Sequence, residues 1–177
     1  MSKYRERGAY HRVLFATPND PYRLHMLDVL EKANRLLPRG SRALDFGCGE
    51  GLLIEKLRDI GITAIGWDAD REAVRLGRRL GNEVWHGRIR SVVVDAFNAV
   101  FVLDVLEHVA EDEFKETVDT LLAISPLVFA AVPDRHDRHG VRDFTMESLK
   151  ALFGDGWECL HSETRHARHL VVMRLKR

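Results

Sequence analysis

The sequence is poor in cysteine, in net charge and in long apolar runs. Two cysteines in 177 residues are too few for the disulfide framework of a small secreted protein. The 27 basic residues are balanced by 27 acidic residues. We therefore expect no general attraction to nucleic acid or to an anionic membrane, although a local basic patch remains compatible with this balance. No apolar run approaches the ~20 residues of a membrane helix, and the N-terminus lacks the apolar segment of a secretory signal. These absences predict a cytoplasmic protein with no membrane insertion.

Two common phosphate-binding motifs are also missing. The stretch ALDFGCGEG, residues 43–51, has the spacing G-x-G-x-G, and Leu52 stands where the dinucleotide fingerprint has its third glycine. No Gly-Lys-Ser/Thr follows, so this is not the phosphate loop of a nucleotide hydrolase. The sequence thus argues against a nicotinamide or flavin dinucleotide as ligand.

Helical and strand patterns alternate along the chain. Helices are predicted over residues 19–37, 52–60, 70–80, 111–124 and 145–153, and strands over 42–46, 63–67, 83–89, 99–105, 127–132, 157–160 and 169–175. Continuous apolar strands are typical of parallel sheets covered on both faces. The last two strands follow each other without a helix, which indicates an antiparallel pair.

The predicted fold class is therefore α/β: a doubly wound, mostly parallel sheet with helices on both faces and a C-terminal antiparallel strand pair. We expect a single domain over residues 1–177, with an N-terminal helical cap at 1–40 and an α/β core at 41–177. The stretch from 4 to 22, rich in Tyr, Arg and His, is expected to fold over the mouth of the ligand pocket.

Two carboxylates stand at the ends of the first two predicted strands. In such a sheet, ligands bind beyond the carboxyl ends of the strands, where the first strand passes into the first helix. Asp45 lies there, just before the glycine turn, and is placed to receive an ammonium group. Asp68 ends the second strand, where a carboxylate accepts both hydroxyls of a ribose. A ligand with a ribose, an amino acid end and no phosphate fits this set, and S-adenosylmethionine (SAM) is such a ligand.

Several stretches resemble the class I SAM-dependent methyltransferases, in particular the group of ubiquinone-pathway O-methyltransferases. They are ALDFGCGEG, ITAIGWDAD at 62–70, FVLDVLEHV at 101–109, RHGVRDFTMESLKALF at 138–153 and the shorter DPYRL at 20–24. The resemblance implies a cofactor-binding set of Arg23, Asp45, Gly47, Cys48, Gly49, Asp68, Ala69, Leu103 and Asp104. It also implies that Arg23 pairs with the methionine carboxylate and that Leu103 forms a wall of the pocket.

One segment departs from the family pattern. The family usually carries an acidic residue after the third strand, which contacts adenine, and then a further helix. Here the third strand ends in WHGR at 85–88, and Asp95 already belongs to the approach to the fourth strand. We therefore expect an adenine pocket that is more open than usual or that offers backbone contacts only.

The candidate residues for the chemistry follow the fourth strand. Methyl transfer is an in-line displacement, so the enzyme must position the nucleophile and remove any proton that it carries. Asp104, Glu107 and His108 have the spacing i, i+3, i+4, which one helical turn places on one face. Together with His139 they form a carboxylate and imidazole set that suits Mg²⁺ or Mn²⁺. His108 and His139 are thus the candidate catalytic residues, and all four are candidate metal ligands; the alternative is that His108 only braces the fold.

The function predicted from these features is transfer of a methyl group from SAM to O or N of a small-molecule acceptor. Two alternatives stay open. A metal-assisted RNA 2′-O-methyltransferase is one, because the enzymes that methylate small-RNA 3′ ends carry a metal-binding Glu-x-x-Glu-His and a later histidine, a pattern that this chain resembles with Asp104 in place of the first Glu. The balanced charge weighs against nucleic acid as partner. A SAM-binding regulatory or scaffold subunit without turnover is the other. The acceptor and the oligomeric state are not indicated by the sequence.

Overall fold

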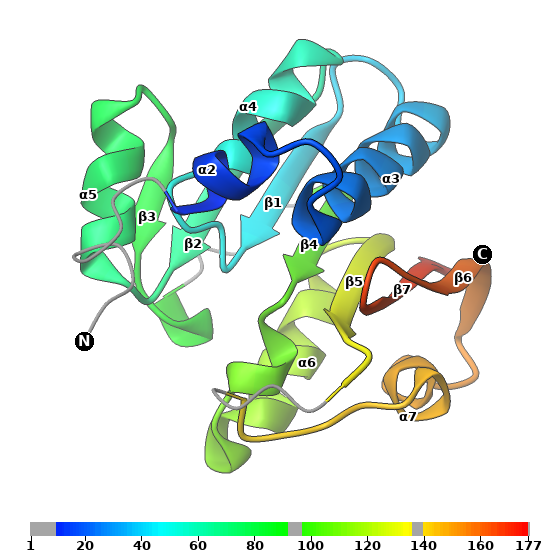
Figure 1. Ribbon diagram of the computed structural model, residues 1–177. Coiled ribbons are helices and arrows are strands. Elements are labelled where there is room, and N and C mark those ends of the chain that lie inside the picture. Colours follow the sequence, from blue (N-terminus) through cyan, green and yellow to red (C-terminus); the bar gives the residue numbers. More distant parts are fainter. Residues whose placement is uncertain (1–9, 92–96, 136–139, 177) are drawn as a thin grey trace. The chain divides into compact units, whose positions relative to one another are not determined.

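The computed structural model of the chain describes residues 10–91, 97–135 and 140–176 (Figure 1). The chain divides into two compact units, residues 1–92 and 93–177, and each is described by itself. Among the described residues, no helix combines the length and the apolar character that crossing a membrane requires.

The first unit is built on three parallel strands. β2 (Thr63–Asp68) pairs with β1 (Arg42–Phe46) on one side and with β3 (Val84–His86) on the other. α4 (Leu52–Asp59) connects β1 to β2, and α5 (Arg71–Arg79) connects β2 to β3. β1 is buried along nearly its whole length, as expected for a strand covered on both faces. The carboxyl ends of β1 and β2 therefore lie side by side, since Phe46 is in register with Trp67.

Two helices precede β1. α3 (Pro21–Leu36) begins as the sequence predicts, because the Asp20 side chain accepts a hydrogen bond of 2.8 Å from the backbone N–H of Tyr22 and Pro21 occupies the first helical position. α2 (Tyr10–Ala16) was not predicted as a helix. Its seven residues carry no acidic side chain in the first turn, so the usual signal for a helix start is missing.

The second unit joins parallel and antiparallel strands. β4 (Ala99–Leu103) pairs in parallel with β5 (Leu127–Pro133), and α6 (Glu111–Ala123) connects them. β7 (Arg168–Leu175) runs antiparallel to β5 and to β6 (Trp157–Arg165), which confirms the predicted C-terminal pair. The rings of Phe101 and Phe129 stack with centroids 4.5 Å apart and are fully buried in the core of this unit.

The remaining elements of the second unit are short. η2 (Leu106–His108) is a single 3₁₀ turn after β4, and α7 (Met146–Ala151) begins with a capping box between Thr145 and Ser148. β6 continues five residues beyond its predicted end at residue 160, because His166 and Ala167, with φ of 52° and 60°, form a tight turn that keeps the strands paired to their ends. In the first unit, β3 ends earlier than predicted, at His86, and the 3₁₀ turn η1 (Ile89–Ser91) follows.

Candidate functional site

The glycine turn after β1 folds back against the end of β2. Gly47, Gly49 and Gly51 have φ of 81°, 55° and 83°. This left-handed region is one that glycine adopts without steric cost, which explains the three glycines. The backbone N–H groups of Gly47 and Cys48 both donate to the carbonyl oxygen of Trp67, at 2.7 and 3.2 Å. The turn is thus fixed to the carboxyl end of the neighbouring strand.

The carboxylate of Asp68 is held by two backbone N–H groups. Gly49 donates to Oδ2 and Asp70 donates to Oδ1, both at 2.7 Å. Ala69 lies between the two acids at the start of the connection to α5. The structure therefore brings the predicted ribose-binding carboxylate directly onto the predicted cofactor turn, and it fixes the orientation of both oxygens.

Asp45 is buried at the end of β1, with 4% of its surface exposed. Burial above all, and then the nearby carboxylates of Asp68 and Glu50, raise the pKa of this carboxyl from 3.8 to about 8. A buried carboxyl with acidic neighbours is poorly solvated in its charged form, so a cationic group placed beside it is strongly favoured. This is the electrostatic setting that an ammonium ligand requires.

Cys48 points away from the turn into the packing between strand and helix. The residue is 5% exposed. A Cβ atom added to Gly66 on β2 would lie 2.5 Å from the Cys48 Sγ, so the thiol fills the space that Gly66 leaves. Burial raises the pKa of the Cys48 thiol above its usual value, which keeps the thiol protonated. The side chain of Cys48 supports the turn, and its predicted contact with the cofactor stays a prediction.

Glu50 and His11 belong to this site, although the sequence analysis did not single them out. Glu50 is fully buried within the glycine turn, and its Oε2 lies 2.9 Å from the Nδ1 of His11 on α2. The His11 ring also stacks on Tyr22 of α3, with centroids 5.2 Å apart. The signal available in the sequence was a charged residue between Gly49 and Gly51, where the turn leaves little contact with solvent.

A second ion pair connects α2 to α4. Arg12 binds the carboxylate of Glu55, which also accepts a hydrogen bond of 2.8 Å from Asn82 Nδ2. Burial acts to raise the pKa of Glu55, but the hydrogen bonds from Arg12 and Asn82 lower it on balance. Through His11 and Arg12, α2 therefore lies against the glycine turn and α4, and the expectation that residues 4–22 fold over the mouth of a ligand pocket stays a prediction.

Arg23, the predicted partner of the methionine carboxylate, connects α3 to the end of α2. Its Nη1 donates to the carbonyl oxygen of Phe15 at 2.7 Å, and its guanidinium carbon lies 5.2 Å from the centroid of the Phe15 ring. A guanidinium has five N–H donors, so these contacts leave capacity for a carboxylate.

The remaining predicted cofactor residues, Leu103 and Asp104, belong to the second unit. Leu103 ends β4, and Asp104 follows it with a left-handed φ of 55°. The Asp104 carboxylate is clamped by Arg168: Nε donates to both oxygens at 2.9 and 2.8 Å, and Nη2 lies 2.7 Å from Oδ2. This bidentate geometry is among the strongest that two charged side chains form.

The expectation that Asp104, Glu107 and His108 share one helical face is wrong. η2 is a three-residue 3₁₀ turn that starts after Asp104, and its geometry separates the side chains. Glu107 is 2% exposed, whereas the side chain of His108 is 41% exposed. The two remain neighbours, with His108 Nε2 3.7 Å from Glu107 Oε1.

The described residues of this region do not fit a metal ion. The Asp104 carboxylate already binds Arg168, and among residues 10–91, 97–135 and 140–176 no group of three acidic, histidine or cysteine side chains is placed to hold one. His139, the fourth predicted ligand, and Asp95 lie outside the described residues. The backbone N–H of Val141 donates to the Glu107 carbonyl oxygen at 2.7 Å, so the segment that follows His139 does reach η2.

Comparison with known proteins assigns the chain to a family. A family model described as a methyltransferase domain matches residues 16–176. A ubiquinone biosynthesis O-methyltransferase from Agrobacterium fabrum is 33% identical over 119 residues, which cover 59% of this chain and 45% of that protein. The corresponding protein from Sinorhizobium fredii is 33% identical over 107 residues, 55% of this chain and 43% of the relative. The chain thus spans about half the length of the curated relatives it matches.

Solved structures confirm the predicted fold. The magnesium protoporphyrin IX methyltransferase from Synechocystis, crystallised with bound S-adenosylhomocysteine (SAH), superposes with a TM-score of 0.75 at 15% identity, over 88% of this chain and 84% of that chain. A protein from Pyrococcus horikoshii superposes with a TM-score of 0.74 at 17% identity, over 94% and 98% of the two chains. At these identities the likeness shows the fold alone.

Proposed function

Because this chain belongs to the family of methyltransferase domains, we propose that it transfers a methyl group from SAM to an oxygen or nitrogen atom of a small-molecule acceptor. The observation that carries the proposal is the Asp68 carboxylate, held at 2.7 Å by the N–H of Gly49 in the glycine turn. The printed name of the curated relatives, ubiquinone biosynthesis O-methyltransferase, points to a small organic acceptor. The proposal extends that class of acceptor to this chain.

The ribose, the ammonium group and the carboxylate of SAM each have a proposed partner in the first unit. Asp68 accepts hydrogen bonds from the ribose hydroxyls, since its two oxygens are already oriented by backbone donors. Asp45 receives the ammonium group, because a buried carboxyl with a raised pKa gains most from a cation beside it. Arg23 pairs with the carboxylate of the methionine moiety through the donors that Phe15 leaves available. SAM itself supplies the activated methyl group on its sulfonium.

Binding of the cofactor is tested by calorimetry with SAH and the variant Asp68→Ala. We expect the variant to lose at least tenfold in affinity, because two ribose hydroxyls lose a charged acceptor. Asp59→Ala is the matched control, since Asp59 is an exposed acid at the end of α4 that pairs with Lys56. Asp68→Asn retains one oxygen acceptor for the turn and shows whether loss of binding follows from loss of charge. Absence of SAH binding to folded wild-type protein overturns the proposal.

His108 is the proposed general base for an acceptor that carries a proton. Its side chain is half-exposed in η2, and the buried Glu107 carboxylate lies 3.7 Å from its Nε2, the ring nitrogen proposed to take the proton. His108→Ala should lower kcat by 10²–10⁴-fold, the usual contribution of a general base, with SAH affinity unchanged. The measurement is transfer of a labelled methyl group to an acceptor found by screening small molecules.

Glu107→Gln is the companion variant for this test. It preserves the size of the side chain and removes the charge beside His108 Nε2, so kcat should fall by less than in His108→Ala while SAH affinity stays unchanged. Full turnover by His108→Ala with the same acceptor assigns His108 to bracing the fold, and this part of the proposal then fails independently of cofactor binding.

A further inference from the structure

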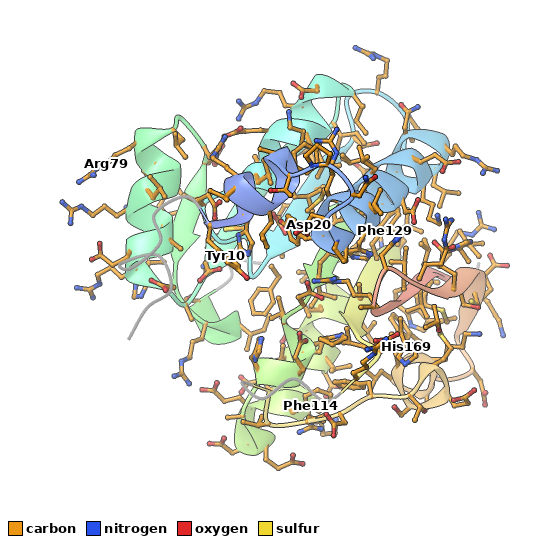
Figure 2. All side chains as sticks on the ribbon, viewed as in Figure 1. Tyr10, Asp20, Arg79, Phe114, Phe129 and His169 are labelled. Atoms are coloured by element: carbon orange, nitrogen blue, oxygen red, sulfur yellow. The ribbon has the colours of Figure 1, made fainter. Side chains whose placement is uncertain are left out.

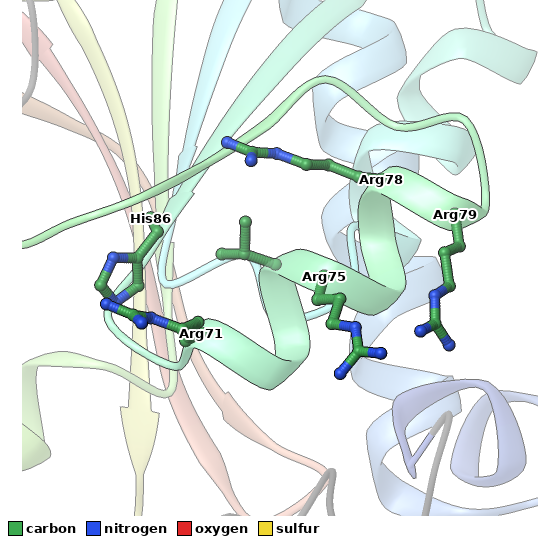
Figure 3. Close-up of a pocket in the computed structure, with 6 residues that line it drawn as sticks. Arg71, Arg75, Arg78, Arg79 and His86 are labelled. Carbon is green, nitrogen blue, oxygen red and sulfur yellow. The ribbon is translucent and has the colours of Figure 1, made fainter.

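A basic pocket lies along α5 and the end of β3. It has a volume of about 500 Å³ (Figure 3). It is lined by Arg71, Val74, Arg75, Arg78, Arg79 and His86. This volume is within the usual range of small-ligand sites, but the lining is almost entirely cationic or polar.

The spacing of the arginines places them along one face of the helix. Arg71, Arg75 and Arg79 follow each other at intervals of four residues, so their side chains stack along α5. Over eight residues this row covers about 12 Å of helix axis, which is more than one phosphate group requires. Arg75 and Arg79 extend in the same direction from successive turns, while Arg71 lies beside His86 of β3 (Figure 3).

Little acidic charge opposes this row. Arg75 lies 3.6 Å from Glu72 in an exposed pair, which contributes little to stability and is easily exchanged for another anion. Among the described residues, no acidic side chain forms an ion pair with Arg71 or Arg79. Arg79 projects outward from α5 (Figure 2). A zero net charge for the whole chain is thus compatible with a strongly positive local surface.

The exposed ring of Trp85 lies outside the lining of the pocket. Trp85 of β3 is 46% exposed, an unusual fraction for a large aromatic side chain. Arg78 connects it to the pocket: its Nε donates to the Val84 carbonyl oxygen at 2.9 Å, and its guanidinium carbon lies 5.6 Å from the centroid of the Trp85 ring. The other face of the ring is supported by Trp67, at 6.0 Å between centroids.

We propose that this pocket binds a ligand that carries two or more phosphate groups, such as a nucleoside diphosphate, with the arginine row of α5 on the phosphate oxygens. The arginine fork matches phosphate oxygens in bidentate geometry, and the lining of the pocket contains no lysine. A free nucleoside diphosphate and a single strand of RNA share this chemistry. The site goes beyond the proposed methyl transfer and is independent of it.

The test uses the full chain saturated with SAH, so that nucleotides do not occupy the cofactor turn. Binding of a fluorescein-labelled 12-nucleotide single-stranded RNA is followed by anisotropy at several salt concentrations, and ADP binding by calorimetry. The variant is Arg71→Gln combined with Arg79→Gln. The control is Arg35→Gln, which removes one exposed arginine of α3 outside the pocket. Thermal melting verifies that the variants are folded.

We expect the double variant to bind RNA roughly tenfold more weakly and to lower the slope of log K against log salt by about 1.4, or about 0.7 for each phosphate of a single strand that is no longer neutralised. Trp85→Leu should bind RNA as the wild-type protein does, because the ring lies outside the lining of the pocket. If ADP binds but RNA does not, and the double variant weakens ADP binding, the ligand of this pocket is a free nucleotide. The proposal is overturned if neither RNA nor ADP binds, or if the double variant binds as Arg35→Gln does.

Discussion

At the scale of single residues, the buried carboxyl of Asp45 has the strongest electrostatic consequence. Its pKa is raised to about 8 by burial and by the carboxylates of Asp68 and Glu50. Between 3.8 and about 8 the folded protein keeps this carboxyl protonated, whereas the unfolded chain ionises it. The folded state then binds more protons, so its stability falls as the pH rises through this range, by at most ~1.4 kcal/mol per pH unit.

Replacement of Asp45 by Asn should remove this dependence. We expect Asp45→Asn to be more stable than the wild-type protein at pH 8 and to show a flatter decrease in the free energy of unfolding between pH 5 and pH 8, as measured by urea denaturation. Equal pH dependence in the two proteins would contradict the burial of a protonated carboxyl.

The same carboxyl couples SAM binding to proton release. An ammonium group beside Asp45 favours its ionised form, so SAM or SAH should bind with release of up to one proton at neutral pH, and its affinity should increase toward pH 8. Calorimetry in buffers of different ionisation enthalpy measures the release. In Asp45→Asn the release should disappear and the affinity should decrease.

At the scale of secondary-structure elements, α2 depends on contacts to the elements against which it lies. The helix has seven residues, none of them buried, and isolated helices of this length are unstable in water. Its position is therefore determined by His11 on Glu50 and by Arg12 on Glu55. A helix that is held by a few polar contacts is suited to open when a ligand enters the turn below it.

His11→Ala tests this dependence. It removes a hydrogen bond to a fully buried carboxylate and should lower the free energy of unfolding by about 1–3 kcal/mol. It should also accelerate amide hydrogen exchange across residues 10–16. Val13→Ala is the control on the same helix, because Val13 is 61% exposed and its truncation should leave both quantities unchanged. Equal exchange in the two variants would show that His11 does not hold the helix.

At the scale of the whole molecule, a ligand that binds only the folded state stabilises it by mass action. SAH at 100 times its dissociation constant should add about 2.7 kcal/mol, which corresponds to an increase in Tm of roughly 5–10 °C for a chain of this size. Differential scanning fluorimetry measures the shift, and Asp68→Ala should show little of it at the same SAH concentration. An unchanged Tm for the wild-type protein would argue against a cofactor site on this chain.

Most of the fold was predictable because local signals agree with tertiary packing. β1, β4 and β5 are short apolar runs in the sequence and are buried along nearly their whole length. The Asp20-Pro21 start of α3 is visible as a cap and a first-turn proline. α2 was not predicted from the sequence, because a short helix that is stabilised by tertiary contacts carries little local signal.

The site was predictable where a backbone motif dictates it. The glycine spacing and the position of Asp68 placed that carboxylate on the turn, and Gly49 does donate to it. The spacing of Asp104, Glu107 and His108 led to a wrong prediction of a shared helical face. That prediction assumed an α-helical turn and an Asp104 carboxylate that binds no other side chain. A residue 64 positions later in the chain, Arg168, binds Asp104, and no pattern local to 101–109 contains that partner.

The contact between Gly66 and Cys48 has a consequence for redesign of this protein. A Cβ atom at 66 would lie 2.5 Å from the sulfur and 2.8 Å from the Cδ1 of Ile54, so even alanine forces the loop above it to move. The space beneath the glycine turn is thus limited by a strand position with no predicted contact to the ligand. Libraries that seek to accept bulkier sulfonium donors should hold this position constant and vary the outer rim.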